Sequence, residues 1–340
     1  MLSQRRTTNI LLLFIVVPLV FYLLKTLKFI FIPLVFSMFV ALFFLPLLRG
    51  LRKRKVPKYI AILLVILIIL GTIVLGIELI QLSSKQIMAS KGDFIIKAQE
   101  KINLLISALE ETFGVTVAQE QNMLGRFVHK DNIVTTVGFL QKTLTMILMT
   151  AFFVVLWLAE SINVQKLINA TILKQKHTSI KTFMKAEKDL ITFIKVKVFV
   201  SLLTGIFTGL ACVAFDVSFP IFWGLFAFVI NFVQMVGSFI SVISLSIFAL
   251  VELDPTSTLF FFILAITGVQ VLFGAILEPI FMGKSFSINI ITVLVMLMLW
   301  GYIWGVPGLI MAIPITVFLK IIFEQFPSTK KIADMISEAN

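Results

Sequence analysis

The chain has 340 residues, of which 59% are hydrophobic and 14% are charged, and its formal net charge is +12. Ordinary soluble domains carry about 25% charged residues, and a soluble fold of this size could not bury so much apolar side-chain surface. The composition therefore excludes a soluble globular protein and predicts an all-α polytopic membrane protein. We attribute the positive charge to cytoplasmic loops beside anionic lipid headgroups, and we expect no nucleic-acid partner.

Six uncharged stretches of 17 to 23 residues have the length of a helix that crosses the bilayer. They lie between the charged residues at positions 6–25, 28–49, 58–78, 142–160, 197–216 and 254–278. Two further stretches, 217–251 and 285–319, hold 35 uncharged residues each. This is too many residues for one span and too few for two full spans. We expect each to form a helical hairpin, either two short crossings or a re-entrant loop, which gives eight or more membrane segments.

The distribution of Lys and Arg predicts the orientation of these segments. The loop 49–58 is strongly basic, and so is the segment that follows the fourth span and includes Lys195 and Lys197. Both should be cytoplasmic, which places both termini in the cytoplasm. The connection 82–140 has balanced charge and helical spacing, so we expect a helical element outside the membrane, interrupted at Gly92.

These assignments predict five regions along the chain. They are N-terminal spans at 1–81, an extracytoplasmic helical segment at 82–140, a span with a basic cytoplasmic helix at 141–197, a transport domain with both hairpins at 198–325, and a cytoplasmic tail at 326–340.

The last third of the chain shows one order of elements twice. A span at 198–215 precedes a hairpin entered from outside, and a span at 256–278, of opposite direction, precedes a hairpin entered from inside. Inverted repeats of this kind let a transporter expose one central site to each side in turn. The order therefore predicts a membrane transporter.

Polar residues inside the spans mark candidate sites, because each costs free energy in hydrocarbon unless it is paired or hydrated. Glu278 is the first candidate for a coupling carboxylate, since the helix-breaking Pro279 follows it. An interfacial ion pair with Lys284 is the alternative. Asp216 is the second candidate carboxylate, with a solvated boundary position as its alternative. The other candidates for the pathway are hydrogen-bonding side chains and glycines: Asn231, Gln234, Gly237, Ser238, Gln270, Asn289, Gly301, Gly305 and Gly308.

The uncharged polar candidates could equally form hydrogen bonds between helices. The glycines predict close approach of the hairpin arms, so leucine at Gly305 or Gly308 should stop transport while folding and membrane insertion stay intact. Gly205 and Gly209 form a GxxxG pair, which predicts a tightly packed helix contact.

Residue types that support metal, redox or nucleotide chemistry are scarce. Cys212 is a single cysteine, and His129 and His177 fit no metal-binding spacing. The GKS sequence at 283–285 is not a phosphate-binding loop. Such a loop has a second glycine five residues before the glycine of GKS, and this position is Glu278. We expect no cofactor, no metal, no nucleotide and no enzymatic activity.

The C-terminal third resembles a known family in FPIFWGLFAFVINFVQMVGSFIS at 219–241, in Leu-Glu-Pro at 277–279, in GKS at 283–285, and in the glycine series that ends in Pro314. It is similar to the autoinducer-2 exporter family, also called the PerM-like permeases. The resemblance implies a transporter of small solutes in the bacterial inner membrane. Some members export autoinducer-2, and others exchange sodium or lithium for protons. It also implies homo-oligomers, pentamers among them, and an elevator-like movement of the hairpin domain.

Two departures from the family pattern lie in the hairpins. The family often has Pro-Tyr-x-Gly-Pro where this chain has QMVGS at 234–238, and a His-Pro pair where it has Asn-Ile at 289–290. The substrate is therefore not carried over from the family, and neither is a protonation role for that histidine.

Three functions remain open at this point. The first is a secondary transporter that exports a small polar solute of the autoinducer-2 type. The second is a sodium(lithium)/proton antiporter that uses Glu278 or Asp216. The third is a non-transporting scaffold that recruits a partner through its extracytoplasmic helices, which deletion of residues 85–138 would inactivate.

Overall fold

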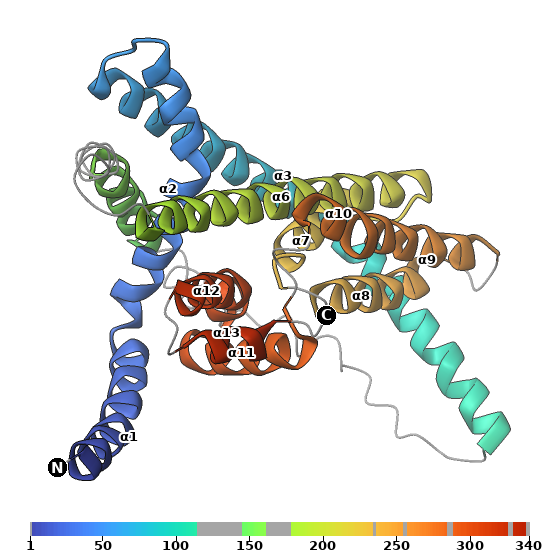
Figure 1. The fold of residues 1–340 in the computed structure, drawn as a ribbon. Coiled ribbons are helices and arrows are strands. Elements are labelled where there is room, and N and C mark those ends of the chain that lie inside the picture. Colours follow the sequence, from blue (N-terminus) through green and yellow to red (C-terminus); the bar gives the residue numbers. More distant parts are fainter. Residues whose placement is uncertain are drawn as a thin grey trace. The chain divides into compact units, whose positions relative to one another are not determined.

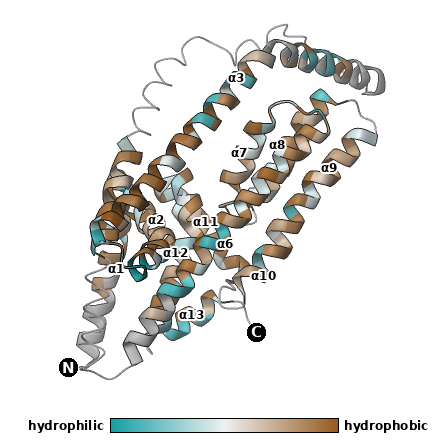
Figure 2. Ribbon diagram, turned by 90° about the horizontal axis from the view of Figure 1, so that it is seen from above, coloured by the Kyte–Doolittle hydropathy of each residue, from teal (hydrophilic) through white to brown (hydrophobic). Residues whose placement is uncertain are grey.

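The computed structural model describes residues 2–113, 145–160, 178–233, 236–253, 257–283, 288–325 and 329–337 (Figure 1). Within these ranges the secondary structure is helical, with one isolated β-bridge between Ile288 and Ser337. Five of the described helices are long and apolar enough to cross a bilayer, and five shorter ones are also apolar. Hydrophobic residues predominate along α7, α8 and α9 (Figure 2). The predicted fold class, an all-α polytopic membrane protein, is confirmed.

The helices have the following bounds. They are α1 (Leu2–Thr26), α2 (Lys28–Lys53), α3 (Lys58–Phe113), an unlabelled helix (Thr145–Glu160), α6 (Thr178–Ala214), α7 (Pro220–Ile230), α8 (Val236–Glu252), α9 (Ser257–Gln270), the π-helix η1 (Val271–Leu277), α10 (Glu278–Met282), α11 (Ile290–Trp304), α12 (Val306–Gln325) and α13 (Lys330–Ile336).

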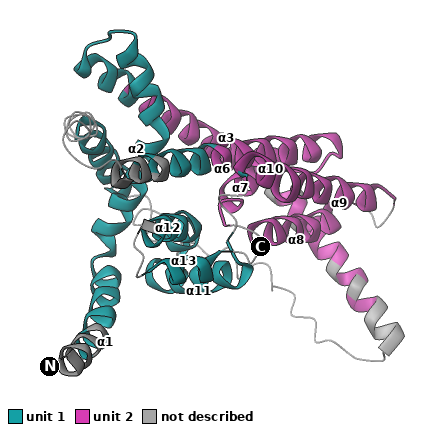
Figure 3. Cartoon of the chain, in the orientation of Figure 1, with its two compact units in different colours: residues 1–66, 143–195, 283–340 teal, residues 67–142, 196–282 magenta. Residues whose placement is uncertain are grey.

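The chain divides into two compact units, coloured separately in Figure 3. Unit 1 comprises Met1–Ile66, Thr143–Lys195 and Gly283–Asn340, and unit 2 comprises Leu67–Lys142 and Val196–Met282. The first predicted hairpin, α7–α8, belongs to unit 2, whereas the second, α11–α12, belongs to unit 1.

Helix α3 joins two elements that were predicted to be separate, the third membrane span and the beginning of the extracytoplasmic segment. Its 56 residues form one continuous helix, about 84 Å long, that begins as an apolar span and passes through Gly92 without a break. The predicted interruption at Gly92 is therefore wrong. Within unit 2 the distal part of α3 contacts the base of the first hairpin, because the Phe94 ring stacks on Phe248 at 4.8 Å and lies 6.5 Å from Phe219.

In unit 2, helices α6 and α7 pack with their backbones in contact, as the GxxxG pair predicts. A Cβ atom at Gly205 would lie 2.7 Å from the carbonyl oxygen of Gly224, and one at Gly224 would lie 2.9 Å from that of Gly205. A Cβ at Gly209 would lie 3.1 Å from the carbonyl of Pro220. Because these neighbours are backbone atoms, they can move away only if a whole helix moves.

Gly224→Ala is expected to lower the stability of unit 2 by about 1–3 kcal/mol, because the methyl group forces α6 and α7 apart. The measurement is thermal unfolding of the purified protein in detergent. Gly268→Ala is the matched control, since that glycine lies in the interior of α9 with no atom within 4 Å of its Cβ position. Equal unfolding temperatures for the two variants would contradict the close packing.

The first hairpin has arms of unequal length. Helix α7 has 11 residues and α8 has 17, or about 17 Å and 26 Å of helix. The backbone N–H of Ser218 donates to Glu252 Oε2 at 2.6 Å, which joins the two ends of the hairpin. At the tip, a Cβ atom at Gly237 would overlap the backbone carbonyl of Ile230, so only glycine fits there. An arm as short as α7 favours a re-entrant hairpin over two full crossings.

The second hairpin, in unit 1, turns at Gly305, whose φ of 67° and ψ of −140° suit glycine and disfavour L side chains. Gly308 packs directly against the carbonyl of Trp300. The end of α1 is attached to this hairpin: Trp304 Nε1 donates to the Leu24 carbonyl at 3.0 Å.

Candidate functional site

A line of buried polar side chains follows one face of α6 in unit 2. Its members are Lys197, Ser201, Thr204 and Thr208, and each has at most 4% of its surface exposed. Their spacing of four, three and four residues places them on one face of the helix, over about 17 Å. We call this set the polar stripe. Polar residues inside an apolar span mark solute or ion pathways, because hydrocarbon offers them no partner.

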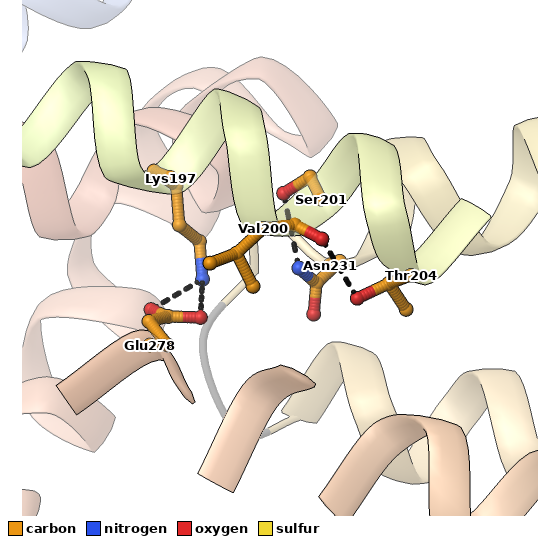
Figure 4. Close-up of polar contacts among 6 residues, drawn as sticks. All are labelled: Lys197, Val200, Ser201, Thr204, Asn231 and Glu278. Atoms are coloured by element: carbon orange, nitrogen blue, oxygen red, sulfur yellow. Dashed lines mark hydrogen bonds and ion pairs between the residues drawn. The ribbon is translucent and has the colours of Figure 1, made fainter. Parts of the chain in front are cut away.

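At one end of the stripe, Lys197 forms an ion pair with Glu278 (Figure 4). The ammonium Nζ lies 2.8 Å from Oε1 and 3.0 Å from Oε2, so it bridges both carboxylate oxygens. Both side chains are 5% exposed. Each charge compensates the other, and removing either would leave an uncompensated ion in apolar surroundings.

Glu278 directly follows a π-helical segment. Its backbone N–H donates to the carbonyl of Phe273, five residues earlier, and the chain then continues as α10. The expectation that Pro279 breaks the helix is therefore wrong, since the missing N–H is accommodated by a widened turn instead. The exposed Pro279 ring lies in α10 beside the buried Glu278.

The middle of the stripe contacts the tip of the first hairpin. Asn231, the residue after α7, donates from Nδ2 to Ser201 Oγ at 3.0 Å, and both residues are buried (Figure 4). Thr204 donates to the carbonyl of Val200 in its own helix at 2.9 Å. Asn231, predicted as a pathway residue, thus joins the hairpin tip to α6.

Helix α6 runs antiparallel to the continuous helix formed by α9, η1 and α10. Three aromatic pairs fix this register: Phe215 with Phe262, Phe207 with Phe273, and Phe199 with Phe281. In this register Thr208 and Gln270 lie at about the same level. Both are buried, and Thr208 Oγ1 and Gln270 Oε1 lack a hydrogen-bond partner among the described residues. Buried polar atoms without partners are rare in folded proteins and indicate a place for a ligand or water.

The other predicted site residues lie elsewhere. Asp216 is exposed in the turn after α6, with a φ of 55°, and about 26 Å of helix separates Lys197 from the end of α6 that precedes it. In unit 1, Gly301 lies in α11, Gly305 in the turn and Gly308 in the first turn of α12. Lys284, the partner considered for Glu278, and Gln234 lie outside the described residues.

Asn289 has a structural role at the start of α11. Its side-chain Oδ1 accepts a hydrogen bond from the backbone N–H of Ile291 at 2.9 Å, and its own N–H donates to the carbonyl of Ile336. This is N-terminal helix capping, in which asparagine is among the preferred residues.

Asn289→Ala is therefore expected to destabilise unit 1 by about 1 kcal/mol while the apparent affinity for the transported solute stays unchanged. Asn289→Asp, which keeps the capping oxygen, should restore most of the stability. Thermal unfolding and the solute concentration dependence of transport measure the two effects. A weaker solute affinity in both variants at normal stability would instead place Asn289 in the pathway.

Four residues of the site were not predicted from the sequence: Lys197, Ser201, Thr204 and Thr208. Lys197 was assigned to the basic cytoplasmic segment, whereas the structure buries this lysine against Glu278. The signal was present, because a lysine followed at four, seven and eleven residues by Ser or Thr within an apolar run has helical periodicity.

An all-α polytopic fold with a buried ion pair and a buried polar stripe is typical of membrane transporters. Residues 10–328 match the family described as AI-2E family transporter, so the chain belongs to that family of bacterial inner-membrane, multi-pass transporters. It is 22% identical over 314 residues to the AI-2 transport protein TqsA of Escherichia coli, with 89% of this chain and 88% of TqsA covered.

Two further relatives carry names that refer to transport alone. A provisionally named transport protein of Haemophilus influenzae is 24% identical over 313 residues, covering 89% of this chain and 88% of the relative. One of Borreliella burgdorferi is 34% identical over 133 residues, covering 39% of this chain and 37% of the relative. The predicted family is confirmed, and so is membrane transport as its activity.

Proposed function

We propose that the protein is a secondary transporter that exports a small polar solute, of the kind named for TqsA, along the polar stripe of unit 2. The observation that carries this proposal is the set of buried polar groups on α6, which begins at the Lys197–Glu278 ion pair. Ser201, Asn231 and Thr208 offer hydroxyl and amide groups to an uncharged polar solute.

The first hairpin supplies a moving element in this proposal. Its tip touches the stripe through Asn231, and its first arm, α7, is too short to span the hydrocarbon core alone. A small displacement of this tip would break the Asn231–Ser201 hydrogen bond and open the stripe. Alternating access then requires that the tip open toward one side of the membrane at a time.

The proposal is tested with purified protein in proteoliposomes preloaded with autoinducer-2, whose efflux is followed over time. We expect efflux that saturates with solute concentration and that falls in Asn231→Leu and Ser201→Val. Gly268→Ala serves as a control with an unaltered stripe. Efflux equal to that of protein-free liposomes would refute export of this solute.

Cation/proton antiport is a second candidate function, favoured by the buried carboxylate of Glu278. An antiporter carboxylate must lose its proton before it binds the cation. The proton flux evoked by Na⁺ should therefore fall as the pH falls and vanish in Glu278→Gln. Proteoliposomes that contain a pH-sensitive dye would report a proton flux evoked by Na⁺. If the solute alone evokes flux, export holds and antiport does not.

Three further features belong to the same proposal: both termini in the cytoplasm, assembly into homo-oligomers, and an elevator-like motion. Deletion of residues 85–138 tests the competing scaffold role, because it removes the segment that this role requires, together with the Phe94 contact to the first hairpin. Continued transport by the deletion variant would eliminate the scaffold.

A further inference from the structure

The turn of the second hairpin is attached to the end of α1. Trp304 Nε1 donates to the carbonyl of Leu24 at 3.0 Å, across 280 positions of sequence. The ammonium nitrogen of Lys25 lies 3.7 Å from the centre of the Tyr302 ring, a cation–π contact. These contacts join the last turn of α1 to the last turn of α11 within unit 1. The hairpin turn cannot slide along α1 unless both contacts break.

The base of the same hairpin is closed by α13. At the start of α11, the N–H of Asn289 donates to the carbonyl of Ile336 at 2.9 Å, and an antiparallel β-bridge joins Ile288 to Ser337. At the other end of α13, the hydroxyl of Thr329 donates to a backbone carbonyl near the end of α12. Helix α13 therefore links the two arms at the point where the hairpin begins and ends.

Helix α12 is long enough to carry the turn across the bilayer. Its 20 residues extend about 30 Å, and Val306–Glu324 has the length and composition of a membrane span. The other arm, α11, extends about 22 Å, a mismatch that local thinning of the bilayer accommodates. The end beside α13 carries exposed charges, among them Lys330 and Lys331. Trp304 and Tyr302 flank the turn, and these residue types concentrate at membrane–water interfaces. The two ends of the hairpin therefore suit opposite membrane surfaces.

The first hairpin is built differently, although both have 35 uncharged residues. Its arm α7 extends about 17 Å, which leaves the tip at membrane depth. That tip is joined to α6 by the hydrogen bond between Asn231 and Ser201, which both belong to the proposed pathway. The second hairpin is attached at its turn and at its base to segments of its own unit. The two hairpins are therefore suited to different tasks.

We propose that the second hairpin crosses the membrane completely and stays in place during transport, with Trp304, Tyr302 and Lys25 as positioning residues that fix its turn. The inference rests on the proposed function, in which the first hairpin moves and opens the polar stripe. Alternating access requires that one part of a transporter move while another part stays in place. The attachments to α1 and α13 assign the stationary part to the second hairpin.

The first test is the accessibility of single cysteines in right-side-out and inside-out membrane vesicles. Val306→Cys, next to the turn, and Met335→Cys, on α13, replace side chains that are 65% and 78% exposed. A membrane-impermeant maleimide should label the two variants from opposite sides of the membrane. The unaltered protein is the control and should not react, because Cys212 is fully buried. Labelling of both variants from one side, or no labelling of Val306→Cys from either side, would overturn the complete crossing.

The second test locks the base of the hairpin with a disulfide. Ile288 and Ser337 lie beside the Asn289–Ile336 hydrogen bond as a non-hydrogen-bonded pair, whose Cα atoms are about 4.5 Å apart in such bridges, within disulfide range. The oxidised double-cysteine variant should release autoinducer-2 from proteoliposomes as fast as the reduced one. Efflux that stops on oxidation and returns on reduction would overturn the stationary hairpin. Efflux absent from every protein would remove the proposed function, while the labelling test still decides the crossing.

The third test removes both contacts at the turn in the double variant Trp304→Phe/Lys25→Gln. Amide hydrogen exchange of residues 305–309 should become about tenfold faster, the combined contribution of one hydrogen bond and one cation–π contact. The maximal efflux rate should fall, whereas the solute concentration for half-maximal efflux should not change, because the polar stripe is intact. Lys28→Gln, an exposed lysine three residues further on, is the control. Unchanged exchange in the double variant would overturn the role of α1, whether or not the protein transports autoinducer-2.

Discussion

Lys197→Met and Glu278→Gln are each expected to destabilise unit 2 by about 3–5 kcal/mol, because each leaves a single buried charge without its counter-ion. Both should also abolish transport. The double variant, which has neither charge, should recover most of the stability but none of the transport. A buried ion pair adds little net stability, and its removal as a whole is tolerated far better than the loss of one partner.

The measurement is thermal unfolding of the four proteins in detergent, arranged as a double-mutant cycle, with transport measured in proteoliposomes. Lys195→Met is the matched control, because Lys195 is exposed on the same helix two residues earlier and should tolerate the change. Additive losses in the double variant would show that the two side chains do not interact. Transport that survives in the double variant would assign the pair to folding alone.

Gly308→Ala is expected to prevent the second hairpin from folding, because its Cβ would overlap the backbone carbonyl of Trp300. Gly305→Ala should cost less, about 1–3 kcal/mol, since the space beside Gly305 is open and the cost comes from its positive φ. This corrects the expectation that leucine at Gly308 would leave folding intact. The clash involves backbone, and neither helix arm can yield locally.

Gly50→Ala is the control for this series, because it lies in α2 of the same unit with no atom near its Cβ position. The yield of monodisperse protein and its unfolding temperature should rank Gly50→Ala first, Gly305→Ala second and Gly308→Ala last. A Gly308→Ala variant as stable as Gly50→Ala would contradict the packing of the α11–α12 turn.

The fold class and the helices were predictable from the sequence because both depend on local composition. Apolar runs bounded by charged residues identify helices that can cross a bilayer, and the 35-residue runs identify hairpins. The GxxxG pair likewise predicted a close helix contact, since a glycine pair one turn apart serves that purpose wherever it occurs. Gly92 by itself did not decide whether α3 ends or continues there, because an isolated glycine is tolerated in a helix although it weakens it.

The candidate site was predictable only in part. The sequence alone identified Glu278 and Asn231 as polar groups in apolar surroundings, and it determined the family and the transport activity. The partners of these residues were decided by tertiary structure, because Lys197 lies 81 residues from Glu278 and Ser201 lies 30 from Asn231. The sequence places Lys197 in the basic cytoplasmic segment. Only the antiparallel packing of α6 against α9, η1 and α10 brings this lysine to Glu278 and buries the pair. The periodicity of one segment does not specify which distant helix will face it.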